Sequence, residues 1–537
     1  MKRLGALLLC AALLFSFAGC GKKAGGESFG FVLSAEPKQI DPQAVSDTAS
    51  LAVISAVFEG LTALDEDGRA ISAAADWTVS ADGCTYTFIL KESYWSTVSV
   101  RGEKTGFEDP VMVTADDFVF AVRRTADPTT RSPYTAQLSG IRNAAAVLAG
   151  EASSTTLGVE ALDEKTLVFR LDAPDDGFTR RLASPAFMPC NREFFAYTAG
   201  RYGLETRYIL TNGAFRVSGW EHDTAVTLRK NENYHAAAAV LPALVKYRIS
   251  TDAAENYDLL RRAYIDAAEV PAAEQDTAEE NGVRLVELRD TVRFLYLNTA
   301  DEVLANVDVR RAVRDAVEWE TLNAGVGAGC AAAIGYTAPA ATAGGKAYTA
   351  PATACPLKTD VPRAQKALAD GLTALERTRT PSLTLLAPDD TDSANLARYI
   401  VQSLAKNLSI YCSLELAAAA EVQKRVRAGR YQLAICDVTA AGLTALENLA
   451  AFKSGNTQNY ARLESAAFDA AYDRATDSAA AVTTLEQLLY DAAPALPLAY
   501  VTRCYGVRAE DTGITVRPFN GGAFGALLSF KTADRKK

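Results

Sequence analysis

Histidine is scarce among the residues that could do chemistry in this sequence, with only His222 and His235 among its 537 residues. Neither lies in a His-x-x-x-His pattern or beside a set of carboxylates, so a zinc or non-haem iron site is not favoured. Two histidines also offer few ways to build a Ser–His or Cys–His catalytic pair. Carboxylates are plentiful, but no spacing singles out an acid pair of the glycosidase type. We therefore expect no catalytic residue, no metal and no cofactor; an anchored surface hydrolase remains the enzymatic alternative.

Cysteine is the second candidate for chemistry. Of nine cysteines, seven follow Cys20 at wide spacings with no Cys-x-x-Cys pattern, which argues against a zinc cage and a dense disulfide framework. Two pairs stay open as disulfides in an oxidising compartment. Cys412 and Cys436 lie on strands predicted to be neighbours, and Cys330 and Cys355 flank one loop. Burial as free thiols is the alternative for all of them.

The glycine-rich stretch 325–329 could in principle cradle a phosphate. It follows a predicted helix instead of joining a strand to a helix, and it lacks the Lys-Ser or Lys-Thr of a Walker loop. Helix termination by glycine is therefore the better interpretation.

The N-terminus predicts export and a modified cysteine. Residues 1–19 read as a signal peptide, with a basic start, an apolar run of about fifteen residues and a small-residue exit, whereas a membrane-spanning helix needs roughly 20 residues. The exit 17–20 looks like a bacterial lipobox, with Phe17 where leucine is usual, so Cys20 is the expected lipidation site. Residues 20–28 would then form a flexible tether anchored to the cell membrane. An ordinary cleaved signal with an incidental cysteine is the alternative.

Charge and length limit the partners and the architecture. The formal net charge is −10, and loss of Lys2 and Arg3 with the signal peptide makes it two units more negative. A chain without a basic excess is a poor candidate for tracking phosphates, so we expect no nucleic-acid partner. The mature length allows two to four domains with buried cores.

Short strands and amphipathic helices alternate along the chain, which predicts a mixed α and β architecture. Thr114 with Asp117 forms a variant of the capping box at the start of a helix. Beyond residue 360, strands alternate with helices, which predicts a βαβ lobe with a parallel sheet. The predicted strands there are 383–386, 409–416, 431–436 and 496–501, and the predicted helices are 362–375, 394–404, 421–428, 465–476 and 482–492.

A set of ordered fragments covers nearly the whole mature chain. They include Ile40-Asp-Pro42, Phe58-Glu-Gly-Leu61, Ser80-Ala-Asp-Gly83, Tyr86 to Lys91, Val113 to Phe118, Ser132-Pro-Tyr134, Thr211 to Phe215, Phe294 to Asn298 and Asp308 to Ala312. In this order and spacing they resemble the bacterial oligopeptide/dipeptide-binding family, the extracellular solute-binding protein family 5 of ABC importers.

The resemblance implies an α/β fold, a two-lobed clamp of the periplasmic-binding-protein type with mixed sheets and an additional domain. Lobe I would be discontinuous, the additional domain II would lie between its first two segments in the sequence, and lobe III would be joined to lobe I near residues 291 and 504. The expected ranges are 29–60 with 190–290 and 505–537 for lobe I, 61–189 for domain II and 291–504 for lobe III. Ligand would be enclosed between the lobes by hinge closure.

The resemblance also implies ligand contacts, and there the match breaks. Tyr134 matches a tyrosine that faces the peptide in the family. In the segment 431–448, peptide receptors carry a tryptophan and, three residues later, an aspartate that pairs with the peptide's ammonium group; this chain has Val438 and Ala441. Asp437 and Glu447 are the nearest carboxylates and are the candidate replacements.

We therefore expect a non-catalytic, lipid-anchored receptor that captures peptides outside the cytoplasm and delivers them to an ABC permease in the membrane. We expect it to act as a monomer. Loss of the usual aspartate leaves a receptor for a non-peptide or N-terminally blocked solute as the alternative.

Overall fold

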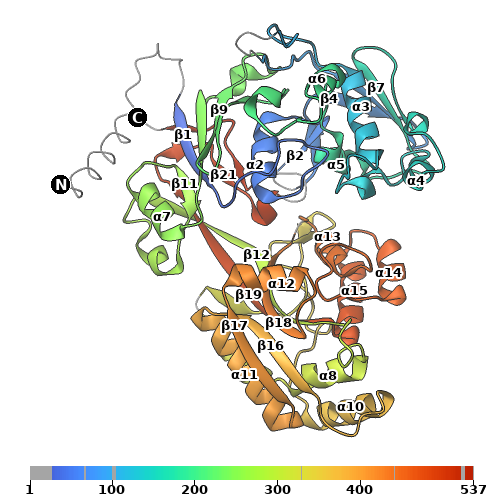
Figure 1. Cartoon of the computed structure of the whole chain (residues 1–537), viewed down its shortest axis with the longest axis vertical. Coiled ribbons are helices and arrows are strands. Elements are labelled where there is room, and N and C mark those ends of the chain that lie inside the picture. Colours follow the sequence, from blue (N-terminus) through green and yellow to red (C-terminus); the bar gives the residue numbers. More distant parts are fainter. Residues whose placement is uncertain are drawn as a thin grey trace.

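The computed structural model describes residues 27–65, 68–98, 104–327, 329–440, 442–521 and 527–535. The predicted signal peptide, Cys20 and most of the tether lie outside these residues, as does Ala441. Figure 1 shows an upper and a lower body, connected by the long strands β12 (Val283–Leu297) and β19 (Ala495–Arg508).

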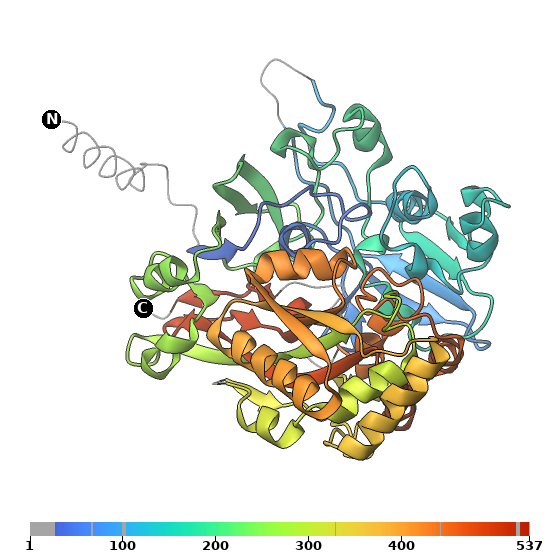
Figure 2. The same cartoon turned by 60° about the horizontal axis from the view of Figure 1, so that its bottom comes forward.

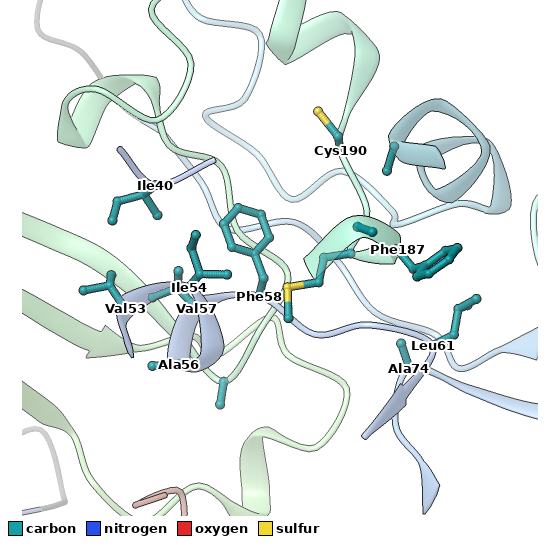
Figure 3. Close-up of a cluster of buried hydrophobic side chains, with 14 of the residues drawn as sticks. Ile40, Val53, Ile54, Ala56, Val57, Phe58, Leu61, Ala74, Phe187 and Cys190 are labelled. Carbon is teal, nitrogen blue, oxygen red and sulfur yellow. The ribbon is translucent and has the colours of Figure 1, made fainter. Parts of the chain in front are cut away.

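The upper body contains a mixed sheet in the order β1-β10-β9-β8. Strand β1 (Ser28–Leu33) runs parallel to β10 (Leu244–Ile249), and β9 (Ala225–Lys230) and β8 (Phe215–Glu221) complete it with antiparallel pairs. Helix α2 (Thr48–Val57) begins at Asp47, whose side chain accepts a hydrogen bond from the Ser50 amide. Its apolar residues join the core shown in Figure 3, where Val53, Ile54 and Val57 lie near Phe58.

A second sheet of the upper body has the order β4-β5-β7-β6, with bounds Ala75–Val79, Thr85–Leu90, Thr166–Arg170 and Val159–Ala161. Helix α3 (Ala115–Ala126) packs against this sheet. The predicted capping box is confirmed, since Asp117 accepts a hydrogen bond from the Thr114 amide at 2.9 Å. Asp117 also accepts one from the Trp95 indole, which joins the helix start to the buried tryptophan.

A sheet in the order β11-β19-β12-β18-β16-β17 extends from the junction, where β11 lies, through the lower body. Strand β16 (Ser382–Pro388) is parallel to both β17 (Tyr411–Ala417) and β18 (Leu433–Thr439), as predicted. Strands β12 and β19 pair antiparallel, so the sheet as a whole is mixed. Successive residues of β12 point to opposite faces of the sheet and so belong to two separate apolar clusters. Leu295 and Leu297 belong to one cluster, and Phe294 and Tyr296 belong to the other.

Helices cover both faces of this lower sheet. Helix α11 (Thr391–Leu408) contacts β16 and β17, and α12 (Ala419–Arg427) contacts β16 and β18; Figure 2 shows orange helices on both sides of the orange strands. The lower body also contains α8 (Val307–Ala316), α9 (Trp319–Ala324), α10 (Val361–Ala374), α13 (Ala445–Leu449), α14 (Ala466–Asp473) and α15 (Ala479–Ala492). Helix α9 ends with Gly325 as its C-cap, which confirms the interpretation of the first glycine in that stretch.

The prediction that Cys412 and Cys436 lie on neighbouring strands is wrong. Cys412 is on β17 and Cys436 on β18, and β16 lies between them in the sheet. Sequence order suggested adjacency, but a βαβ crossover placed the later strand on the far side of β16. All seven cysteines of the described chain carry free thiols, so Cys330 and Cys355 are not bridged either.

The two long strands lose register where they leave the upper body. Their pairing shifts between Leu288 and Thr291, so Asp290 lies within the irregular step. One continuous apolar cluster fills both upper sheets, and separate clusters fill the lower body. The division into 29–60 with 190–290 and 505–537, 61–189, and 291–504 stays a prediction.

Candidate functional site

A cavity of about 300 Å³ lies in the upper body beside the connecting strands. It is lined by the ends of β1 and β10, the first turns of α2, strand β11 (Ala267–Glu269), and Arg503 and Tyr505 of β19. These segments are far apart in the sequence and meet only because β1 pairs with β10 and β11 pairs with β19. The cavity therefore sits where the two bodies are joined.

Two buried tyrosines bring unused hydroxyl groups to this cavity. Tyr247 is 2% exposed and Tyr505 is 6% exposed, and within the described chain neither hydroxyl has a hydrogen-bond partner. Burial raises the pKa of both, so each remains an O–H donor. Among the residues that line this cavity, the Oδ1 atom of Asn256 is buried without a hydrogen-bond partner in the described structure. Because a buried polar group without a partner costs roughly 1–3 kcal/mol, such groups are typical of a site that binds water or ligand.

The charged groups at this cavity differ in how far they are already paired. Arg503 donates to both carboxylate oxygens of Asp290, at 3.1 and 2.6 Å, and Asp290 also accepts from the Phe519 amide at 2.7 Å. Glu269 has no ion pair within the part of the chain that the structure describes. The cavity thus offers hydroxyl donors and one uncommitted carboxylate.

Asp437, the first candidate for the missing ammonium contact, is paired with an arginine. It lies directly opposite Arg293 in the β12–β18 ladder, and Arg293 donates to both of its oxygens at 2.7 and 2.9 Å. The side chain of Arg293 is 9% exposed and that of Asp437 is 39% exposed. Burial opposes the charge on Arg293, but the hydrogen bond and charge of Asp437 outweigh burial and raise its pKa.

Glu447, the second candidate, joins the lower body to the upper one. It forms a capping box with Thr444 at the start of α13. Arg180 of α5 (Phe178–Arg181) donates to both of its oxygens, at 2.7 and 3.0 Å. Arg180 also donates to the Gly68 carbonyl at 3.2 Å, next to the hairpin of β2 (Thr62–Leu64) and β3 (Ala70–Ser72). This ion pair therefore connects α5 of the upper body to α13 of the lower body.

Tyr134 lies inside the upper core. Its side chain belongs to the apolar cluster, and its hydroxyl donates to the Val45 carbonyl at 2.7 Å. Burial raises its pKa. The three predicted ligand residues therefore lie in three different environments, and none of them lines the 300 Å³ cavity.

Sequence reasoning missed the arginines and the two cavity tyrosines. Arg293 carried a signal, since it is the single charged residue in the buried segment 291–297 of β12, and a buried cation needs a partner. Arg180 carried none, because its partner is in the other body. Tyr247 and Tyr505 looked like ordinary core aromatics of strands.

Comparison with known proteins identifies the scaffold. The model of the bacterial extracellular solute-binding proteins, family 5, matches residues 72–460. The chain belongs to this family. Members of family 5 are solute-binding proteins, and the resemblance stated from the ordered fragments is confirmed.

Relatives of family 5 match over different shares of their length. The dipeptide-binding protein DppE of Bacillus subtilis is 26% identical over 96% of this chain and 97% of its own length. The probable deoxycholate-binding periplasmic protein YgiS of Escherichia coli is 30% identical over 52% of this chain and 51% of its own length.

Solved structures confirm the two-lobed fold of this family 5 chain. The pheromone receptor PrgZ, solved for its mode of peptide binding, aligns with a TM-score of 0.76 at 21% identity and covers 95% of this chain and 100% of that one. Listeria monocytogenes OppA bound to peptide aligns with a TM-score of 0.76 at 22% identity and covers 96% and 100%. In the described ranges, no helix is long and apolar enough to cross a membrane, and no group of ligating side chains could hold a metal ion.

Proposed function

We propose that this chain is a lipid-anchored receptor of an ABC importer that captures peptides by hinge closure and delivers them to a membrane permease. The observation that carries the proposal is the cavity at the junction of the two bodies, with its two unused tyrosine hydroxyls. Extended peptides present backbone carbonyls along their length, and these carbonyls are suitable acceptors for such donors. The names of relatives such as DppE support a peptide over other solutes.

Calorimetric screening of the mature protein against peptide pools tests the proposal. We expect saturable binding of at least one pool. Clear binding of a sugar, a chelate or a bile acid, with none of any peptide pool, would contradict it.

A receptor for a non-peptide or N-terminally blocked solute is the second candidate. It is favoured by the pairing of Asp437 with Arg293 and of Glu447 with Arg180, because each arginine already satisfies the carboxylate that would hold a peptide ammonium group. The decisive comparison is between free and N-acetylated peptides. Much tighter binding of the free amines would exclude this candidate. The ligand roles of Tyr134, Asp437 and Glu447 stay predictions.

Anchoring through Cys20 is the second part of the proposal. Two acyl chains on the N-terminal cysteine would hold the mature receptor at the outer face of the cell membrane, where it would act as a monomer beside its permease. Expression of Cys20→Ser should release the protein from the membrane fraction without changing its ligand affinity. Equal membrane retention of the variant and the unaltered chain would contradict the anchor.

A further inference from the structure

A second cavity, of about 250 Å³, lies in the upper body beside the first. Helix α2 contributes to both: Thr48 and Ala52 line the first cavity, and Ser55 and Ala56 line the second. Leu528 of β22 (Leu528–Ser529) lines both as well. Because a helix rises 1.5 Å per residue, the two cavities are compartments along about 12 Å of one helix face.

Arg517 lines the second cavity with an uncommitted guanidinium group. Its Nε atom is buried and has no hydrogen-bond partner, and throughout the described residues the side chain forms no ion pair. Its backbone amide is bound to the Leu527 carbonyl at 2.8 Å, which holds the residue in place beside the cavity. A fixed cation without a partner is a site for an anion, and the planar guanidinium group matches a carboxylate in particular.

The other charged groups at this cavity largely satisfy one another. The Nζ atom of Lys531 is 3.5 Å from Glu59 Oε1 and 3.3 Å from the Tyr234 hydroxyl. The Nε2 atom of His235 is 2.6 Å from the other oxygen of Glu59. Burial raises the pKa of Glu59, but the hydrogen bond from His235 and the charge of Lys531 outweigh burial and lower it. Glu59 and Lys531 thus compensate each other, whereas Arg517 is left with no opposite charge.

The two compartments carry opposite charges at their uncommitted groups, Glu269 in the first cavity and Arg517 in the second. An extended peptide advances about 3.3 Å per residue, so three to four residues match the length of α2 that lines the two cavities. We propose that the second cavity binds the C-terminal carboxylate of a short peptide through Arg517, with the ammonium end toward Glu269. The inference rests on the proposed peptide-receptor function and adds a polarity and a length to it.

Isothermal titration calorimetry with a random tripeptide pool, as free acids and as C-terminal amides, tests the carboxylate site. The unaltered protein should bind the free acids roughly 10-fold to 100-fold more tightly, the range of a charge-assisted hydrogen bond. Arg517→Gln should lose this preference, and Arg517→Lys, which keeps the charge but not the planar fork, should retain part of it. Arg379→Gln, an exposed arginine on the loop after α10, is the matched control and should keep the full preference.

The outcomes separate the two proposals. Equal affinity of the unaltered protein for free acids and amides overturns the carboxylate site and leaves the peptide receptor standing. A preference that survives in Arg517→Gln also overturns the site, because another cation must then hold the carboxylate. Binding of neither pool overturns the peptide-receptor proposal and the inference with it.

Discussion

The two carboxylates that could replace the family's ammonium contact are both paired with arginine, and the two pairs serve different regions. Arg293–Asp437 lies within the lower sheet, between directly opposed residues of adjacent strands. Arg180–Glu447 connects α5 of the upper body to α13 of the lower one. Both are bidentate, with nitrogen–oxygen distances between 2.7 and 3.0 Å.

Two ion pairs with the same bidentate geometry can thus affect different properties, depending on whether they lie within one body or between the two. Arg293 is 9% exposed, so its pair holds a buried cation inside one body and contributes chiefly to folding stability. Arg180 and Glu447 are 26% and 29% exposed, so their pair is weaker, but it exists only while the two bodies are close. The first pair should affect unfolding, and the second should affect the balance between open and closed forms.

The largest loss of stability should come from a third ion pair, Arg503–Asp290, because its carboxylate is the most deeply buried of the three. Asp290 is 0% exposed at the side chain and accepts from Arg503 and the Phe519 amide. Asp290→Ala should lower the free energy of unfolding by about 3 kcal/mol or more, because buried donors lose their acceptor. Urea denaturation measures this loss. A loss below that of Asp437→Asn would contradict the ranking by burial.

A smaller loss is expected for Asp437→Asn, about 2 kcal/mol, because Arg293 loses its charged partner while the exposed side of position 437 admits water. The ratio of affinities for free and N-acetylated peptides should stay unchanged, since Arg293 occupies both oxygens. Glu415→Gln breaks the more exposed bidentate pair with Arg425 on the same sheet and is the matched control. A fall in the affinity ratio for Asp437→Asn would restore its role in binding the ammonium group.

Arg180→Gln should change stability by less than about 1 kcal/mol but weaken ligand binding roughly 2-fold to 5-fold, because the closed form loses an ion pair. Small-angle scattering should show a larger radius of gyration. Glu447→Gln should act similarly, since glutamine can still complete the capping box. Arg170→Gln, which breaks a pair with Glu160 inside the upper body, should leave the radius and the affinity unchanged.

The smallest change in stability, within about 0.5 kcal/mol, is expected for Tyr505→Phe, because its hydroxyl has no partner to lose in the described structure. Peptide affinity should nevertheless fall roughly 2-fold to 10-fold if the hydroxyl binds a ligand carbonyl. Tyr336→Phe removes a hydroxyl that donates to the Ala495 carbonyl, so it should lower stability and spare affinity. Calorimetry and urea denaturation of both variants distinguish the two cases.

Much of the scaffold was predictable from the sequence because its signals are local. The capping box at Thr114 and the helices and strands beyond residue 360 depend on residues a few positions apart. The order of short fragments also identified the family, which the match over residues 72–460 confirms.

The tertiary structure alone decided which groups are free to bind a ligand. Asp437 is 144 residues from Arg293, and Glu447 is 267 residues from Arg180, so no local pattern could indicate that both carboxylates are paired. In the same way, only folding placed Tyr247 beside Tyr505 and left Arg517 without a partner in the described chain. Sequence spacing determines elements through short-range geometry, whereas the charge left over for a ligand depends on long-range contacts that exist only in the folded chain.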